Sequence, residues 1–410
     1  MEYFEFLNKS VTPYHTVETL KALFEAKCDK NTRFFERGGA LIAVRAPKQI
    51  CSDSQFRIAL AHTDFPALKI TPNPDHAAAG IQTLHPEIYG SPIYTSWLDR
   101  DLGYAGLLAY EMDGKVQTKL FRGNKLVRIP QLAVHLNRGV NQDGLKVNPQ
   151  TDLNALWTAS VGTKFTDMLQ REVPQGGKLL DFDVQLFDAQ PAQLGGLEDE
   201  WIFSGRLDNL SSCHAIAEAF AAGQPLEKDF QVAAFFNNEE VGSETREGAG
   251  SNFLRSVLES SLREVAGVNN LDSMLAASLA LSIDMAHAEH PNFVQKHEPN
   301  HAPILGGGVV LKINSQKRYA SDVFSNAQFK LVCKQHNIPY QTFVMRNDMP
   351  CGSTVGPTIS ASLGIPTVDI GEPMLSMHSI REMTSIADHE SMTRLVSAFG
   401  DKPTEHFKLI

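Results

Sequence analysis

Cysteine is scarce in this chain of 410 residues: there are five, scattered along the sequence and without a CxxC pair. An odd, dispersed set argues against a disulfide framework and against a thiolate zinc site, so any metal would be held by His, Asp and Glu. Long apolar runs are lacking too, because none approaches the ~18 residues of a membrane span. The first twenty residues show no secretory-signal pattern. We therefore expect a cytoplasmic protein without a membrane partner.

Basic charge and phosphate-binding motifs are also missing. The formal net charge is -10, which provides no basic face for a nucleic acid or an anionic membrane. The run Gly306-Gly307-Gly308 lacks the Lys and Ser/Thr of a P-loop, and there is no G-x-S-x-G elbow. What remains is an ordinary globular composition, 42% hydrophobic and 20% charged. The length allows roughly two or three domains of about 150 residues each.

Apolar strands alternate with helices in the first and last parts of the chain. The stretch "QFRIALAHTDFP" predicts a strand over 56–61, and "VAAFF", "ASLALSI", "GVVLKIN" and "IPTVDIG" predict four more. The stretch "LDNLSSCHAIAEAFAAG" predicts a helix that ends at Gly223, and we expect Thr16 and Ser321 to cap two further helices. This alternation predicts an α/β fold in which helices cover both faces of a mainly parallel sheet.

The middle of the chain has a different texture. The stretch "LLAYEMDGKVQTKLFRGNKLVRI" contains short strand-like runs, and its turn signals Asp113-Gly114 and Gly123-Asn124 predict hairpins. The simplest arrangement is one α/β catalytic domain, residues 1–71 and 202–410, interrupted by an inserted β-rich domain, residues 72–201.

Acidic and His side chains cluster at the ends of the predicted strands or next to them. In open α/β sheets, ligands bind at the carboxyl ends of the strands. Together such residues are the oxygen and nitrogen ligands expected of a two-metal hydrolase. Each also has a plainer explanation, such as a helix cap or a solvated acidic loop. The residues at these positions are His62, Asp64, Asp208, Glu239, Glu240, Asp284, Glu372 and His378.

Seven stretches, in this order along the chain, resemble the aspartyl aminopeptidase family of two-metal aminopeptidases. They are "HTDFP", "WLDRDLG", "RLDNLSS", "FFNNEEVGSETREGAGS", "SIDMAHAEHPNF", "KHEPNHAPILGGG" and "DMPCGST…MHSIRE". The ordered set, from about His62 to Glu382, is far more specific than any one stretch. The resemblance implies a metal-dependent aminopeptidase that releases N-terminal residues, with a preference for Asp or Glu, from peptides with a free N-terminus.

The resemblance also implies which residues hold the metal ions. One ion is held by His62 and Asp284, the second by Glu240 and His378, and Asp208 bridges both. This ligand set suits zinc, with manganese or cobalt as alternatives.

By the same mapping, Glu239 is the general base and Asp64 orients His62 or the attacking water. Two divalent cations ~3.5–4 Å apart can activate a water and stabilise negative charge on the substrate. Their charge also makes two adjacent carboxylates tolerable. In a loop, neighbouring side chains can diverge, so that Glu240 holds an ion while Glu239 takes the proton.

Two further residues have implied roles in substrate binding. Lys312, in "VVLKIN", matches the basic residue of the family's pocket, although it could also be a solvated lysine on an edge strand. The "CGS" of Cys351 to Ser353 matches a segment that lines this pocket. His135, in "AVHLNR", matches a His that enters the active site of a neighbouring subunit. The resemblance thus implies a homo-oligomer in which dimers, formed through the inserted domain, combine into a dodecameric tetrahedral particle.

Three other functions compete with an aminopeptidase. The stretch "HEPNH", His297 to His301, fits the H-E-x-x-H pattern of single-zinc proteases. That motif needs a continuous helix, which Pro299 and Pro303 oppose, so we reject it. A two-metal N-acyl amino acid deacylase or carboxypeptidase-like hydrolase would share the same ligands. A non-enzymatic particle-forming or binding protein with a relic site is disfavoured, because every ligand and the base are present.

Overall fold

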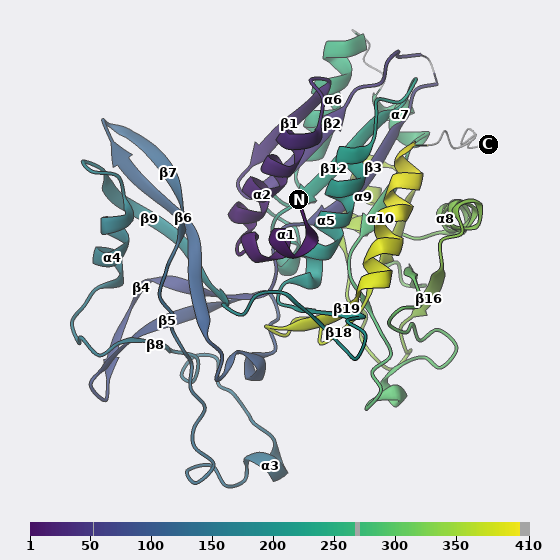
Figure 1. Cartoon of the computed structure of the whole chain (residues 1–410). Coiled ribbons are helices and arrows are strands. Elements are labelled where there is room, and N and C mark those ends of the chain that lie inside the picture. The colour runs from purple at the N-terminus through teal and green to yellow at the C-terminus, as the bar shows by residue number, and fades with distance from the viewer. Residues whose placement is uncertain (52, 267–270, 402–410) are drawn as a thin grey trace.

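In the computed structural model, which describes residues 1–51, 53–266 and 271–401, an eight-stranded sheet is the frame of the molecule (Figure 1). In hydrogen-bonded order its strands are β1 (Thr32–Arg37), β2 (Ala40–Arg45), β12 (Phe230–Phe236), β3 (Phe56–His62), β13 (Leu279–Ile283), β17 (Thr367–Gly371), β15 (Val309–Ile313) and β16 (Tyr340–Val344). The neighbours β12, β3, β13 and β17 run parallel, whereas β15 is antiparallel to β17. The predicted α/β fold with a mainly parallel central sheet is confirmed.

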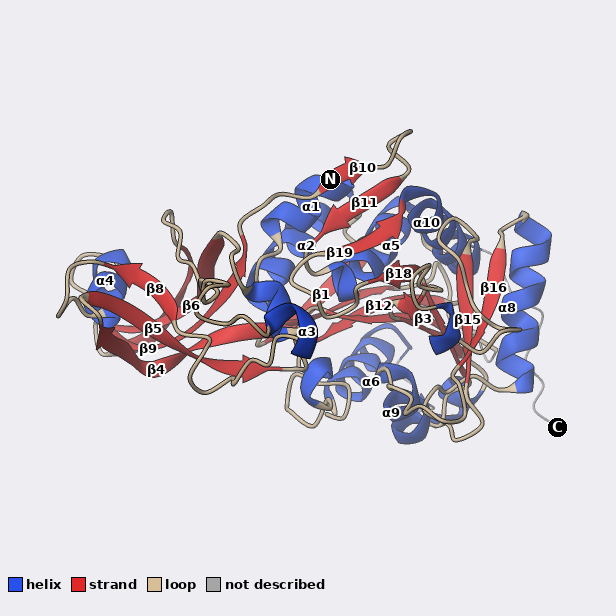
Figure 2. Ribbon diagram, turned by 90° about the horizontal axis from the view of Figure 1, so that it is seen from below, coloured by secondary structure: helices blue, strands red, loops and turns tan. Residues whose placement is uncertain are grey.

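Helices cover both faces of this sheet (Figure 2). Strands β3 and β12 are buried along their whole length, as parallel strands covered on both sides should be. One face is covered by α1 (Tyr3–Lys9), α2 (Pro13–Lys27), α5 (Leu207–Ala222), α8 (Val323–His336) and α10 (Ile386–Asp401). The other is covered by α6 (Phe253–Ala266), α7 (Leu271–Ala276) and α9 (Val355–Leu363). As predicted, α5 ends at Gly223.

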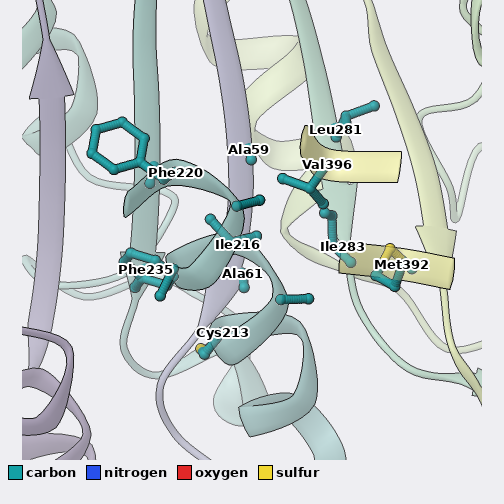
Figure 3. Packing of buried hydrophobic residues seen from close by; sticks show 14 of the residues in the cluster. Ala59, Ala61, Cys213, Ile216, Phe220, Phe235, Leu281, Ile283, Met392 and Val396 are labelled. Carbon is teal, nitrogen blue, oxygen red and sulfur yellow. The ribbon is translucent and has the colours of Figure 1, made fainter. Parts of the chain in front are cut away.

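The packing of α5 on the sheet determines where the first turn of the helix lies relative to the strand ends (Figure 3). Ile216 of α5 lies over Ala59 and Ala61 of β3, and Phe220, one turn further along the helix, belongs to the same apolar cluster. Because these alanines are small, the helix can lie close to the strand. Its first turn, which contains Asp208, is thereby held at the end of the sheet where β3 terminates.

A second sheet, antiparallel throughout, stands beside the first. In hydrogen-bonded order its strands are β7 (Lys115–Arg122), β6 (Leu102–Met112), β9 (Lys178–Asp188), β4 (Ala67–Ala78), β5 (Ile81–Tyr89) and β8 (Ala155–Thr158). The helix α4 (Phe165–Glu172) packs on it, and α3 (Val140–Asp143) lies on a loop that extends away from it (Figure 1). The strands run from Ala67 to Asp188, a span that differs from the inserted segment 72–201. The domain limits stay a prediction, as does dimerisation through this sheet.

A third, smaller sheet borders the carboxyl ends of the central strands. It contains β10 (Gln193–Gly195), β11 (Trp201–Ser204), β19 (Glu382–Ser385), β18 (Pro373–Leu375) and β14 (Ala286–His287). Three short 3₁₀ turns complete the regular structure of the described residues: η1 (Tyr94–Trp97), η2 (Glu239–Val241) and η3 (Val294–Lys296). Within the described part of the chain, no helix has both the length and the apolar character that a membrane crossing requires.

One of the two predicted hairpins is present. Asp113 and Gly114, both with positive φ, join β6 to β7, as expected of this turn signal. The prediction for Gly123-Asn124 is wrong. After Gly123 the chain continues along the same edge of β6, where Val127 bridges Leu102.

Both predicted helix caps are wrong: the cap lies four residues earlier in one helix and one residue later in the other. The helix α2 begins at Pro13 and is capped by Thr12, whose hydroxyl accepts a hydrogen bond from the His15 N–H. Proline at the first helical position needs no backbone donor, so the start falls before Thr16. The helix α8 is capped by Asp322 instead of Ser321, since an aspartate can accept from two backbone N–H groups at once.

A buried carboxylate ties the second sheet to the segment before β19. Asp188, at the end of β9, accepts hydrogen bonds from Arg100 at 2.6 Å and from Arg381 at 3.3 Å. Its side chain is only 1% exposed. Removing it would leave two guanidinium groups without their shared anion.

We therefore expect Asp188→Ala to lower the free energy of unfolding by roughly 3 kcal/mol, because the remaining charges lose their partner. The control is Asp101→Ala, which breaks an exposed pair with Arg128 and should leave stability close to unchanged. Urea unfolding midpoints measure both. Equal midpoints for the two variants would contradict the structural role of Asp188.

Candidate metal centre

The carboxyl ends of three parallel neighbours converge at one edge of the central sheet. His62 is the last residue of β3, and Asp284 directly follows β13. Glu239 and Glu240 begin the turn η2, which is separated from the end of β12 by two residues. The structure thus brings together four of the predicted residues because their strands end side by side.

Two more of the predicted residues reach the same place from outside the sheet. Asp208 lies in the first turn of α5, where the backbone at Asp208 and Asn209 departs from helical geometry. The Asn209 amide donates to the carbonyl of Ile283 at 2.9 Å and so anchors this turn to the end of β13. His378, with φ of 66°, lies on the loop between β18 and β19.

These side chains form two clusters that share Asp208. In the first, Nε2 of His62 lies 3.6 Å from Oδ1 of Asp208 and 3.6 Å from Oδ1 of Asp284. In the second, Nε2 of His378 lies 3.5 Å from Oδ2 of Asp208 and 3.4 Å from Oε2 of Glu240. Ligand atoms at the corners of a zinc tetrahedron lie roughly 3.4 Å apart. Each cluster therefore has the spacing of a metal site.

The polar atoms of the clusters fit a cation. Oδ1 of Asp208 and Oε1 of Glu240 are buried and have no hydrogen-bond partner among the described residues. An unpartnered carboxylate oxygen is costly to bury, and a bound cation would satisfy it. Imidazole and carboxylate donors without thiolates match the ligands that zinc accepts.

The charge balance points the same way. Burial is the main reason that the pKa of Glu239 rises to about 8, and the negative charges of Asp284 and Asp64 add to this rise against the opposing His62. Burial alone would lower the pKa of His378, but Asp208 and Glu240 outweigh it and raise that pKa to about 10. An excess of negative charge in a buried site favours cations.

Asp64 is a fully buried hub behind the first cluster. Its Oδ1 accepts from the Glu239 N–H at 3.1 Å and lies 3.4 Å from Nδ1 of His62. Its Oδ2 accepts from the Glu240 N–H at 3.1 Å and from the Tyr89 hydroxyl at 2.7 Å. Nδ1 of His62 also lies 3.1 Å from the Asp64 carbonyl, which leaves Nε2 facing the cluster. The geometry therefore fits orientation of His62, whereas Asp64 does not line the cavity.

Glu382 is a buried residue of the site to which reasoning from the sequence gave no role. One of its carboxylate oxygens accepts from the His378 N–H at 2.8 Å, and the other accepts from the Asp208 N–H at 3.2 Å. It therefore joins the two backbone segments of the second cluster. The available signal was its position, four residues after His378 in "MHSIRE".

A cavity of about 530 Å³ opens beside the clusters. Besides the cluster residues its lining includes His287, Lys312, Arg318, Tyr319, Gly352 and Ser353. Lys312 lies on β15, between β17 and β16, and is 2% exposed. Its Nζ is 3.8 Å from Oδ2 of Asp284 and 5.4 Å from the centre of the Tyr319 ring. The alternative of a solvated lysine on an edge strand is therefore wrong.

Two other predicted features lie away from the cavity. His135 is exposed on the loop that follows β7 and does not line the cavity of its own chain. In "HEPNH", the turn η3 ends at Lys296, and the residues from His297 to His301 are not helical. The Glu298 side chain accepts from Nδ1 of His301. The rejection of a single-zinc motif is thus consistent with the structure.

Comparison with known proteins decides the family. A family model described as aminopeptidase I zinc metalloprotease (M18) matches residues 6–399. The chain is 38% identical over 416 residues to a probable M18 family aminopeptidase 2 of Streptomyces coelicolor, with 96% of this chain and 95% of the relative covered. The chain belongs to the M18 aminopeptidases.

Solved structures of this kind share the fold. One is the cryo-EM structure of the Ape4 and Nbr1 complex, with a TM-score of 0.91, 33% identity and coverage of 97% of this chain and 84% of that chain. Another is the S. cerevisiae mApe1 dodecamer, with a TM-score of 0.83, 26% identity and coverage of 97% and 95%. The family resemblance noted from the ordered motifs is confirmed.

The M18 family is one of zinc metalloproteases. The protein is therefore a metal-dependent aminopeptidase, an enzyme that hydrolyses peptide bonds. This overturns the alternative of a deacylase or carboxypeptidase-like hydrolase, and also that of a non-enzymatic protein.

The bridging position of Glu382 predicts an effect on zinc binding. In Glu382→Gln the amide nitrogen faces a backbone N–H that needs an acceptor, so one of the two segments is released. Zinc affinity should fall about 10- to 100-fold, measured by competition with a chromophoric chelator. Asp388→Asn is the matched control, because Asp388 also accepts from two backbone N–H groups, those of Gly306 and Gly308, outside the clusters. Equal zinc affinity in the two variants would refute the role of Glu382.

Proposed function

We propose that this M18 aminopeptidase holds two divalent ions and releases the N-terminal residue, with a preference for Asp and Glu, from peptides with a free amine. One ion would be held by His62 and Asp284, the other by Glu240 and His378, and Asp208 would serve both. The pair of clusters that share Asp208 is the observation that carries this proposal. Zinc is the expected metal, with manganese and cobalt as alternatives.

The side chains around the clusters have separate roles in the hydrolysis of the peptide bond. Two such ions, when bound, activate the attacking water and stabilise negative charge that develops on the substrate oxygen. Glu239 lines the cavity, with Oε2 3.9 Å from Nε2 of His62. It takes the proton of the attacking water and passes it to the leaving amine, as a general base and then a general acid. Asp64 holds the ring of His62 in place.

Lys312 accounts for the preference for acidic residues. Its buried ammonium makes no hydrogen bond within the described part of the chain, and its nearest carboxylate, on Asp284, is 3.8 Å away. A substrate carboxylate in the cavity would supply the missing acceptor. Arg318 adds a second positive charge to the same lining.

The assembly is proposed to be a homo-oligomer of dimers, dodecameric as in the mApe1 structure. On the loop that carries His135, the neighbouring Leu132, Val134 and Leu136 are exposed by 61%, 51% and 74%. Apolar groups of this size at the tip of a loop are typical of an interface. We propose that this loop of the inserted domain brings His135 to the active site of a second copy. We also propose that the assembled enzyme works in the cytoplasm.

A turnover assay on three peptides of otherwise equal sequence tests the function. One begins with free Asp, one with free Leu and one with acetylated Asp, each with and without added zinc or manganese. We expect rapid release of free Asp, slow release of Leu and no reaction at the acetylated end. Cleavage of the acetylated peptide alone would contradict the proposal, and equal cleavage of free Asp and Leu would remove the acidic preference.

Substitutions of the two adjacent glutamates should have different effects. Glu239→Gln should lower kcat by about 10²- to 10⁴-fold, because the proton acceptor is lost, while zinc content stays near that of the wild type. Glu240→Gln should instead lower the zinc content, because a ligand is lost. Metal analysis with steady-state kinetics measures both. Loss of both ions in Glu239→Gln would contradict this division of roles.

Lys312→Met should reduce kcat/KM for the Asp peptide about 10- to 100-fold, the value of one charge-assisted hydrogen bond, and leave the Leu peptide nearly unaffected. Lys317→Met is the control, since the Lys317 ammonium donates to the Ser321 carbonyl and does not line the cavity. Parallel losses on both peptides would rule out a pocket role for Lys312.

A further inference from the structure

The second sheet enters the metal centre through the end of β5. Tyr89, the last residue of this strand, donates its hydroxyl hydrogen to Oδ2 of Asp64 at 2.7 Å. The same hydroxyl oxygen accepts from the side-chain amide of Asn238 at 2.9 Å. Asp64 and Asn238 belong to segments that follow β3 and β12, so one hydroxyl from the second sheet joins two strand ends of the first.

Both hydrogen-bond partners of Tyr89 are next to the backbone of Glu239 and Glu240, one through hydrogen bonds and the other through the chain. Asp64 accepts from the backbone N–H groups of Glu239 and Glu240. Asn238 immediately precedes Glu239, has a positive φ of 64°, and accepts from the Thr245 hydroxyl at 2.9 Å. The hydroxyl of Tyr89 therefore contacts the support of the turn η2 from two sides.

The residues after Tyr89 continue this contact along the second cluster. Gly90 has a φ of +68°, and a Cβ there would lie 3.1 Å from the Cβ of Glu240, so only glycine fits without displacing that side chain. The carbonyl of Ser91 accepts from Nδ1 of His378 at 3.1 Å. The Ile93 N–H donates to the His378 carbonyl at 2.9 Å.

We propose that Tyr89 is a positioning residue of the metal centre, which through Asp64 and Asn238 holds Glu239 and Glu240 in their separate orientations. The second sheet would then support the active site of its own chain, in addition to its proposed role in contacts between subunits. This inference rests on the ligand and base roles proposed above. From the sequence, a tyrosine at the end of a strand is indistinguishable from an ordinary packing residue.

The variant Tyr89→Phe tests the proposal, because it removes one oxygen and keeps the ring against the Lys69 ammonium. We expect zinc affinity to fall about 10- to 100-fold, as for other groups that support a ligand. After saturation with zinc, kcat should fall while KM for the free-Asp peptide changes less, since the lining around Lys312 is not touched. Tyr110→Phe is the matched control: its hydroxyl donates to Gln117 on the neighbouring strand of the same sheet, outside the cavity.

A double-mutant cycle separates positioning through Asp64 from a general effect on the fold. If Tyr89 acts through this carboxylate, adding Tyr89→Phe to Asp64→Asn should change zinc affinity little further. Asn238→Gly provides a second arm, since it removes the other partner and tolerates the positive φ. It should also weaken zinc binding if the proposal holds.

The outcomes distinguish this inference from the proposed function. Zinc affinity and kcat in Tyr89→Phe equal to those of Tyr110→Phe, or full additivity with Asp64→Asn, would overturn the inference while an active wild type sustains the function. A wild type that binds no zinc, or releases no residue from a free-amine peptide, would instead overturn the function itself.

Discussion

The carboxylate of Asp64 is the contact on which the metal centre depends. It is fully buried, yet each of its oxygens has two neighbours: His62 and the Glu239 N–H on one side, the Glu240 N–H and Tyr89 on the other. A buried anion is tolerable only when it is satisfied in this way. The same four contacts fix the ring of His62 and the backbone from which both glutamates project. The geometry of the site is thus determined by Asp64, which lies behind the residues that line the cavity.

The concentration of acidic side chains at this edge has a cost that a cation would offset. Asp208, Glu240 and Asp284 are all largely buried, and two of their oxygens lack a hydrogen-bond partner within the described residues. Burial, with repulsion from neighbouring carboxylates added to it, accounts for the raised pKa of Glu239 and of Glu240. The adjacent glutamates that follow β12 are therefore poorly explained as a solvated loop and well explained as parts of a site that binds positive charge.

Much of the site could be predicted because its residues stand at the ends of strands with clear apolar patterns. His62, Glu239, Glu240 and Asp284 belong to this group, and parallel pairing then places them together. Asp208 and His378 come from a helix start and a loop; the sequence pointed to both as candidates, but only the resemblance assigned their roles as ligands. All five strands expected in the α/β part are present, whereas the hairpin of β1 and β2 was not foreseen.

The residues that sequence reasoning missed act through contacts between distant segments. Tyr89 and Asn238 are hydrogen-bonded although they are 149 residues apart in the sequence, and Glu382 and Asp208 are hydrogen-bonded at a separation of 174 residues. Neither contact can be derived from composition or periodicity, and the spacing of Glu382 from His378 is the one signal in the sequence. The choice between a pocket and an edge-strand position for Lys312 stayed open for a related reason: it depends on β15 lying between β17 and β16, an order that the sequence of elements does not determine.

Anomalous diffraction at the zinc absorption edge, from crystals of the zinc-loaded protein, tests the central claim most directly. We expect two peaks ~3.5–4 Å apart, one beside His62 and Asp284 and the other beside Glu240 and His378, with Asp208 in contact with both. A single peak, or peaks away from these side chains, would contradict the shared centre.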